Sequence, residues 1–142
     1  WLQKGDREYY LLDTYRARLK YPDLRRAVVE QYRRYGAEGI IIESRGSGMS
    51  LIDDLYDEDL PDLPQIWDFE PDVDKVTRIV QVSAPIESGH VHLPREAPWL
   101  EDFRRELMLF PRGRHDDQVD SFSQFLNWAE YQRRHKPQVF WV

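Results

Sequence analysis

Three aspartates and a histidine lie within six residues of one another late in the chain. His115, Asp116, Asp117 and Asp120 form this cluster, and apolar residues then recur at spacings of three and four over residues 119–129, which predicts a helix with one apolar face. Aspartate is favoured at the start of a helix as a cap and by the helix dipole, which accounts for Asp116. It does not account for Asp120, which shares a face with Asp117 one turn into the helix. Because two like charges repel there unless a cation lies between them, we favour a metal site over capping alone.

A glutamate at the end of a strongly apolar segment is the second candidate. Residues 39–44 contain three consecutive isoleucines followed by Glu43. This pattern predicts a strand covered on both faces, as in the middle of an α/β sheet. Open α/β sheets place ligands beyond the ends of such strands. A single glutamate there is often only a surface residue, but the aspartate cluster makes a functional role for Glu43 the better interpretation.

The chemistry open to these carboxylates is that of divalent cations. Oxygen ligands favour Mg²⁺ or Mn²⁺, and a chain without cysteine has no thiolates for a structural zinc. Two such ions about 3.5–4 Å apart can activate a water molecule and stabilise the leaving oxygen of a phosphodiester. The alternative is a set of solvated carboxylates that bind no ion, and residue spacing by itself leaves both open.

Several segments predict the strands that must position these acids. Residues 1–3 and 8–16 favour the two strands of a hairpin, with residues 4–6 as its turn. Residues 77–83 are predicted to form the last main strand. Residues 87–94 indicate a small β-excursion that turns at a glycine and carries two histidines at alternate positions, as surface strand residues would be.

Helices are expected in three further segments. Residues 22–35 begin with proline and end before a glycine, residues 49–55 follow a glycine-rich loop as a short helix, and residues 98–109 show helical apolar spacing. Gly46 and Gly48, ahead of the second helix, are interpreted as turn formers, because the lysine of a phosphate-binding loop is absent. We therefore expect helices on either side of the isoleucine strand, in a crossover arrangement.

Charge is unevenly distributed. Residues 53–74 hold ten acids and no lysine or arginine, so the rest of the chain carries +4 although the whole carries −6. Prolines among these acids predict an acidic surface insert over residues 56–74, not a separate domain. The mildly basic remainder permits a DNA-binding face. The arginines of helix 22–35 favour a solvated face over a DNA contact.

Length and composition fit a single domain over residues 1–142. The chain is 41% hydrophobic, which suits a modest core. It has neither an apolar run of about 18 residues nor a secretory signal, so membrane insertion is not expected. The absence of cysteine excludes disulfides and fits a reducing compartment. The tail 136–142 is expected either to pack back on the domain or to mark a junction.

The acid segment His115–Asp120 is the most specific of a series of motifs that run along most of the chain. The others are Tyr9–Asp13 with Arg16, Tyr21–Leu24, Ile41–Glu43 with Gly48 and Leu51, Lys75 with Arg78, Glu87–Gly89 with Val91, Leu93 and Pro94, Pro98–Leu100, and Phe110 with Pro111. In order and spacing they resemble the C-terminal nuclease domain of the large terminase subunit of tailed bacteriophages. The resemblance implies an α/β, RNase H-like fold, a mixed sheet flanked by helices.

The activity implied by the resemblance is endonucleolytic cutting of concatemeric viral DNA by two-metal phosphodiester hydrolysis. Glu43 would be the second acid of the nuclease centre, and Asp117 and Asp120 would be its last catalytic acids and metal ligands. Asp116 would be a cap or an outer ligand of the metal. The cofactors implied are two Mg²⁺ or Mn²⁺ ions.

The expected macromolecular partner is double-stranded viral DNA, with contacts from Arg45, Arg112, Arg114 and His115. The resemblance further implies a terminase ATPase domain, a small terminase subunit and a portal as protein partners. The setting implied is the cytoplasm of a bacterial host, with the protein encoded by a phage or prophage.

The chain also departs from the family pattern. The first catalytic aspartate of the family lies on a first strand upstream of Trp1, and Asp13 matches a different position. That strand and the ATPase motifs are missing from this sequence, so we expect a partial domain that binds metal weakly and cleaves poorly. Two alternatives stay open: an inactive prophage remnant or non-catalytic docking module, and a RuvC-type junction resolvase, whose final acid pair resembles Asp117 and Asp120.

Overall fold

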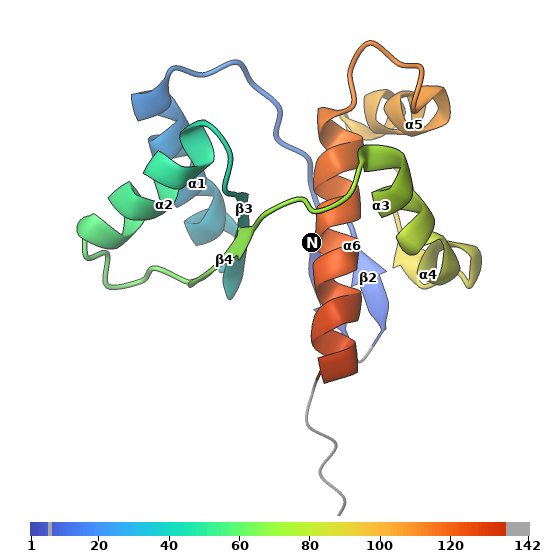
Figure 1. The fold of residues 1–142 in the computed structure, drawn as a ribbon, viewed down its shortest axis with the longest axis horizontal. Coiled ribbons are helices and arrows are strands. Elements are labelled where there is room, and N and C mark those ends of the chain that lie inside the picture. Colours follow the sequence, from blue (N-terminus) through green and yellow to red (C-terminus); the bar gives the residue numbers. More distant parts are fainter. Residues whose placement is uncertain (6, 136–142) are drawn as a thin grey trace, which may run out of the picture. The chain divides into compact units, whose positions relative to one another are not determined.

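Short strands and helices are interspersed along the chain (Figure 1). The computed structural model describes residues 1–5 and 7–135. Contacts divide the chain into two compact units: the first joins residues 1–15 to the chain from Val73 onward, and the second is residues 16–72. Each unit has its own strands and its own apolar core.

A three-stranded mixed sheet with the order β1-β2-β5 lies in the first unit. β1 (Leu2–Lys4) runs antiparallel to β2 (Glu8–Tyr10), and Gly5, with a φ of +62°, lies in the turn between them. β5 (Val91–His92) pairs with β2 in parallel. The predicted hairpin is therefore confirmed, although β2 ends at Tyr10 and not at residue 16.

Glu8 links β2 to the histidines of the predicted β-excursion. Its Oε1 lies 3.0 Å from His90 Nδ1 and its Oε2 lies 2.5 Å from His92 Nε2. Hydrogen bonds from these imidazoles lower the pKa of Glu8. The excursion was predicted in part: the chain turns at Gly89 and β5 follows, but the preceding residues form helix α4 (Ser83–Glu87).

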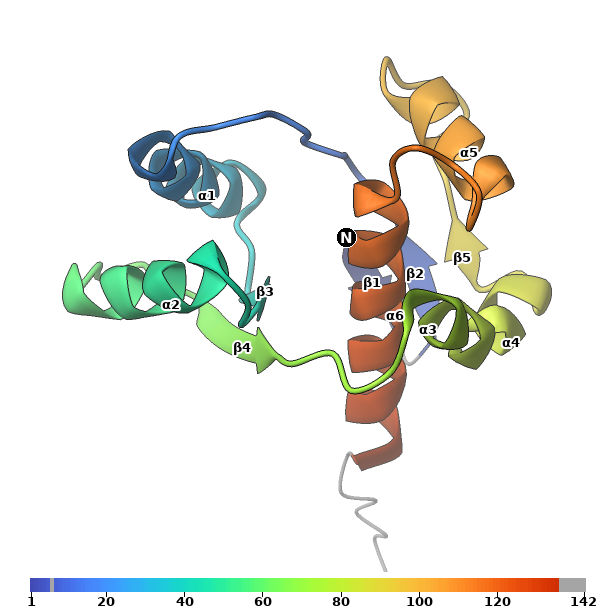
Figure 2. The same cartoon turned by 45° about the horizontal axis from the view of Figure 1, so that its top comes forward.

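The helix expected after the acid cluster is α6 (Asp117–His135), whose apolar face packs on the core of the first unit. Four of the five predicted apolar positions are buried, namely Val119, Phe122, Leu126 and Ala129, and Phe125 is partly buried against the same core. Helices α3 (Lys75–Gln81) and α5 (Leu100–Leu109) lie beside α6 (Figures 1 and 2). α6 is therefore the element around which the first unit is packed.

The prediction of a strand over residues 77–83 is wrong, because most of that segment belongs to α3. The Asp74 carboxylate accepts hydrogen bonds from the backbone N–H groups of Val76, at 3.0 Å, and Thr77, at 3.1 Å. This N-cap satisfies donors that a helix leaves unpaired at its start. The segment is rich in β-branched residues, which favour strands, but the Asp74 cap begins a helix in which Arg78 is buried.

The second unit is a β-α-β arrangement with a further helix. β3 (Gly39–Glu43) pairs in parallel with β4 (Gln65–Phe69). α2 (Ser47–Asp57) lies in the crossover that parallel strands need. α1 (Tyr21–Tyr35) packs on the same core and, as predicted, ends at a glycine in the left-handed conformation. The buried residues of this core are Ile42, Leu51, Leu55 and Ile66.

The acidic segment 56–74 is more than the surface insert that was predicted. It contains β4, whose Ile66 is buried while its neighbour Gln65 and the acid Asp68 are exposed. Ile66 therefore contributes to the core of the second unit, although the strand also carries an exposed acid. The strand was missed because acids and prolines surround its few apolar residues.

Gly48 lies where the first turn of α2 meets the end of β3. A Cβ atom at this position would lie well inside contact distance of the Glu43 carbonyl oxygen. Gly46, with a φ of +55°, forms the preceding turn as predicted. Gly48 was also predicted to form a turn, but it lies inside α2. Because it has no side chain, the backbone of α2 can lie close to the end of β3, the strand that carries Glu43.

The prediction for the tail, residues 136–142, lies outside the described residues. Across residues 1–5 and 7–135, none of the helices combines the length and the apolar character needed to cross a bilayer.

A buried polar group joins α6 to the sheet of the first unit. The Tyr9 hydroxyl donates to Glu130 Oε1 at 2.9 Å, and both residues are buried. Burial and this hydrogen bond raise the pKa of Tyr9 to about 12. Burial acts to raise the pKa of Glu130, but hydrogen bonds from Arg133 and Tyr9 and the nearby positive charges outweigh it, so that the pKa is lowered.

We predict that Tyr9→Phe lowers the free energy of unfolding at pH 7 by about 1–3 kcal/mol, because a buried carboxylate oxygen loses its donor. Since the pKa of Glu130 in the folded state lies below its ordinary value of 4.5, the stabilisation is present above that pH and is lost as pH falls through the folded value. The deficit of the variant should therefore shrink at acidic pH. Urea unfolding at neutral and acidic pH measures this deficit. The control is Tyr131→Phe, which removes an exposed hydroxyl from α6, the helix that carries Glu130. A deficit no larger than that of the control would contradict the role of Tyr9.

We also predict that Gly48→Ala destabilises the second unit by about 1–3 kcal/mol, because its methyl group overlaps the Glu43 carbonyl and forces α2 to move. Ser50→Ala, an exposed position of the same helix, is the matched control. Denaturant unfolding followed by circular dichroism gives the difference. Equal stability of the two variants would mean that the approach of α2 to β3 is not tight.

Candidate functional site

The start of α6 is held by a glutamate from the preceding helix. Glu106 of α5 is 7% exposed, and its Oε1 accepts hydrogen bonds from the backbone N–H groups of Gln118, at 2.6 Å, and Val119, at 3.4 Å. Its Oε2 accepts from the side-chain amide of Gln118 at 2.9 Å. Glu106 thus binds N–H groups that the first turn of α6 leaves unpaired, a role that the sequence suggested for Asp116.

The carboxylates of Asp116 and Asp120 converge on one ammonium group. Lys75 Nζ lies 2.9 Å from Asp116 Oδ2 and 2.7 Å from Asp120 Oδ2. The Asp120 N–H donates to the Asp116 carbonyl at 2.8 Å, so the two acids lie one helical turn apart and project on the same side. Hydrogen bonds to Asp120 and Asp116 raise the pKa of Lys75.

The second oxygen of Asp120 is bound to Arg78. Arg78 Nη2 donates to Asp120 Oδ1 at 2.7 Å, and the Arg78 side chain is 6% exposed. Its Nε has no hydrogen-bond acceptor among the described residues. The Arg78 carbonyl also accepts from Asn127 Nδ2 at 3.1 Å, which fixes α3 against α6. Asp120 is therefore the anion that compensates a buried guanidinium.

The capped start of α3 explains why both cations reach this site. With Asp74 as the N-cap, Lys75 is the first helical residue and Arg78 follows three positions later, on the same face. Lys75 and Arg78 were not predicted to meet the acids of α6, because residues 77–83 were expected to form a strand. The sequence did contain a signal: Asp74 can cap a helix, and Lys75 and Arg78 then lie on one face of it.

Asp117 is the first residue of α6 and is exposed. The sequence predicted a cation between Asp117 and Asp120. The cation observed, Lys75, lies between Asp116 and Asp120, which are four residues apart. Asp116, expected only as a cap or an outer ligand, therefore belongs to the converging pair.

The candidate DNA contacts before α6 lie on the surface. Arg112, Arg114 and His115 are exposed in the turn between α5 and α6, and the Arg112 N–H donates to the Leu109 carbonyl at 2.8 Å. Their role in binding DNA stays a prediction.

Glu43 and Arg45 belong to the second unit. Glu43 is the last residue of β3 and pairs in register with Phe69 of β4, so its predicted place at the end of the apolar strand is confirmed. Arg45 is exposed and donates from Nη2 to the Pro71 carbonyl at 2.9 Å. This bond connects the loop after β3 to the loop after β4.

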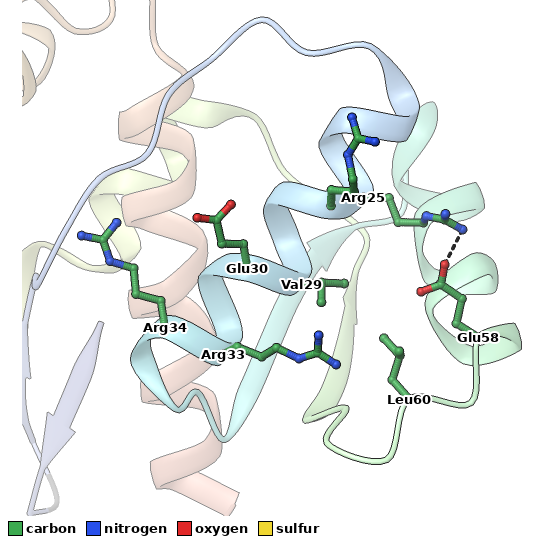
Figure 3. A pocket seen from close by; sticks show the side chains of 8 residues that line it. Arg25, Val29, Glu30, Arg33, Arg34, Glu58 and Leu60 are labelled. Carbon is green, nitrogen blue, oxygen red and sulfur yellow. Dashed lines mark ion pairs between the residues drawn. The ribbon is translucent and has the colours of Figure 1, made fainter.

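An open hollow of about 800 Å³ lies over α1 within the second unit (Figure 3). The arginines of α1 contribute to its lining: Arg25, Arg26, Arg33 and Arg34. Three of them pair with carboxylates of the same unit, in the pairs Arg25–Glu58, Arg26–Asp23 and Arg33–Asp62. Three of the four arginine charges are thus balanced within the unit. We therefore interpret this side of α1 as the solvated face that was predicted, and not as a surface that binds phosphate.

Over residues 1–5 and 7–135, no group of three or more histidine, aspartate or glutamate side chains is arranged to hold a metal ion by itself. Asp116 and Asp120 do bring one carboxylate oxygen each to the Lys75 ammonium. Two carboxylates whose oxygens already converge on one positive charge are of the ligand type that Mg²⁺ and Mn²⁺ prefer.

We predict that Glu106→Gln lowers the free energy of unfolding by about 1–3 kcal/mol, because the first-turn N–H groups of α6 lose a charged acceptor. Glu101→Gln, exposed on the same helix, is the control. The two variants are compared by urea unfolding at neutral pH. If Glu106→Gln costs no more than the control, Glu106 does not fix the start of α6.

A comparison with protein-family models matches residues 1–128 to the family described as "Terminase RNaseH-like domain". The matched span includes residues of both units. No curated protein and no solved structure matches the chain. The α/β class, the mixed sheet and the flanking helices agree with the RNase H-like fold predicted from the sequence. Because the match covers most of the 142 residues, the chain belongs to the terminase RNase H-like domain family.

Proposed function

We propose that the chain is the metal-dependent endodeoxyribonuclease domain of a phage DNA-packaging terminase, which cuts concatemeric viral DNA. Membership of the terminase RNase H-like family supports a nuclease. The observation that carries the metal-dependent part is the convergence of the Asp116 and Asp120 carboxylates on one cationic nitrogen, at 2.9 and 2.7 Å.

In this proposal the metal ligands come from the start of α6 and from the end of β3. Asp117 and Asp120 of α6 act as catalytic acids and metal ligands, and Asp116 joins them as a ligand. Glu43 supplies the acid from the end of β3, which rests on its strand-end position and on the resemblance to terminases. Two Mg²⁺ or Mn²⁺ ions, when bound, would supply an activated water and charge stabilisation at the leaving oxygen.

The protein's own residues supply position and charge. Glu106 fixes the first turn of α6, and Arg78 holds one oxygen of Asp120, so the acids are oriented before any ligand binds. The DNA contacts in this proposal are Arg45, Arg112, Arg114 and His115. The three arginines of this set carry positive charge that can bind phosphates, so DNA affinity would fall as salt rises.

The proposed setting follows from the family. The domain would work with a terminase ATPase domain, a small terminase subunit and a portal, in the cytoplasm of a bacterial host.

Metal titration tests the proposal. Binding to the folded state stabilises it, by about 2.7 kcal/mol when free Mn²⁺ is one hundred times its dissociation constant. We predict that Mn²⁺ raises the melting temperature of the wild-type chain and that Asp117→Asn or Glu43→Gln reduces this rise. Neither substitution removes an ion pair of Arg78, and Asp102→Asn, exposed on α5, is the control.

A melting temperature that Mn²⁺ leaves unchanged in the wild-type chain would contradict the proposal and favour a non-catalytic docking module or an inactive remnant. Incubation with linear, supercoiled and branched DNA in the presence of Mn²⁺ separates the remaining classes. Selective cutting of branched DNA would favour a junction resolvase over a terminase nuclease.

A further inference from the structure

Three carboxylate oxygens of Asp116 and Asp120, at the start of α6, face two cations. Asp120 Oδ1 binds Arg78, whereas Asp120 Oδ2 and Asp116 Oδ2 both bind Lys75. The two acids and two bases cancel in formal charge. As observed, the cluster is therefore electrically neutral, and a divalent ion added to it would meet two positive charges already in place.

The two cations differ in how easily they can leave. The Arg78 side chain is 6% exposed and pairs with Asp120 of α6, and removing that carboxylate would leave a buried charge unpaired. The Lys75 side chain is 47% exposed, lies at the first position of α3, and ends in a compact ammonium on a flexible stem. Rotation of that stem carries the charge into water without unfolding the helix.

These differences assign separate roles to the two oxygens of Asp120. Oδ1 is committed to Arg78 and anchors the carboxylate. Oδ2, together with Asp116 Oδ2, forms a pair of oxygens that already bind a cation and can exchange it. The ammonium holds these two oxygens near each other, in an arrangement that two like charges alone would oppose.

We propose that Lys75 is a resident counter-ion of the metal centre, which a divalent ion must displace from Asp116 and Asp120, while Arg78 stays bound. The inference rests on the proposed function, because it needs a metal to bind at these acids. Lys75 is in this sense a positioning residue. It holds Asp116 and Asp120 in place before metal binds, and it lowers the affinity for metal because its ion pairs must first be broken.

The test measures Mn²⁺ binding to the 142-residue chain by isothermal titration calorimetry, together with the melting temperature in EDTA. Lys75→Gln removes the charge and should lower the melting temperature in EDTA, because Asp116 and Asp120 then repel each other. The same substitution should tighten Mn²⁺ binding by about three- to tenfold, since one or two partly exposed ion pairs no longer have to be broken. Lys75→Arg keeps the charge and should bind Mn²⁺ no more tightly than the wild type, because a guanidinium pairs with carboxylates at least as well as an ammonium.

Lys4→Gln is the matched control, because it removes one exposed lysine of the same unit and changes the net charge equally. It should leave Mn²⁺ affinity unchanged. Tighter binding in both variants would show that net charge alone is responsible, which overturns the inference.

Melting temperature and Mn²⁺ affinity together distinguish a displaceable counter-ion from a purely structural ion pair. If Lys75 were purely structural, its removal would lower stability and leave Mn²⁺ affinity equal or weaker. Equal or weaker binding by a folded Lys75→Gln variant, beside measurable binding by the wild type, overturns the role of Lys75 and leaves the proposed function standing. Absence of Mn²⁺ binding in the wild type and in Lys75→Gln alike overturns the metal centre itself, and the inference with it.

Discussion

The ion pair between Arg78 and Asp120 is the interaction on which the arrangement of the first unit depends. A guanidinium that is almost fully removed from water needs an anion, and α6 supplies that anion at its first turn. Removing one partner of such a buried pair costs about 3–5 kcal/mol, because the other charge is left uncompensated. The candidate metal ligand Asp120 is therefore also a structural anchor, with one carboxylate oxygen for each role.

Two buried glutamates fix the ends of α6 in a similar way. Glu106 binds N–H groups of its first turn, and Glu130 accepts the Tyr9 hydroxyl near its other end. The residues between them pack into the apolar core. A helix held at both ends by polar contacts and along its length by packing cannot easily rotate or slide, so the acids at its start keep a defined direction. This rigidity is what a metal centre needs from its supporting residues.

The two units position their candidate acids by different physical means. In the first unit, side-chain charges orient Asp116 and Asp120. In the second, backbone packing places Glu43: the parallel pairing of β3 with β4 fixes the strand, and Gly48 lets α2 approach its last carbonyl. The family match spans both units, in agreement with the motifs that resemble terminases along most of the chain. Assignment of Glu43, Asp117 and Asp120 to a single centre is part of the proposed function.

By itself, the sequence determined the apolar face of α6, the isoleucine strand ending in Glu43, the glycine that stops α1, and the family. These follow from periodicity, local backbone preference and motif spacing, which are properties of neighbouring residues. Tertiary structure alone decided that β4, inside the acidic segment, pairs with β3, and that Lys75 and Arg78 meet the acids of α6. Those outcomes depend on burial and on charges more than forty residues apart along the chain. A local pattern of β-branched or acidic residues carries no information about such partners, because the energy that selects the structure comes from contacts that exist only after folding.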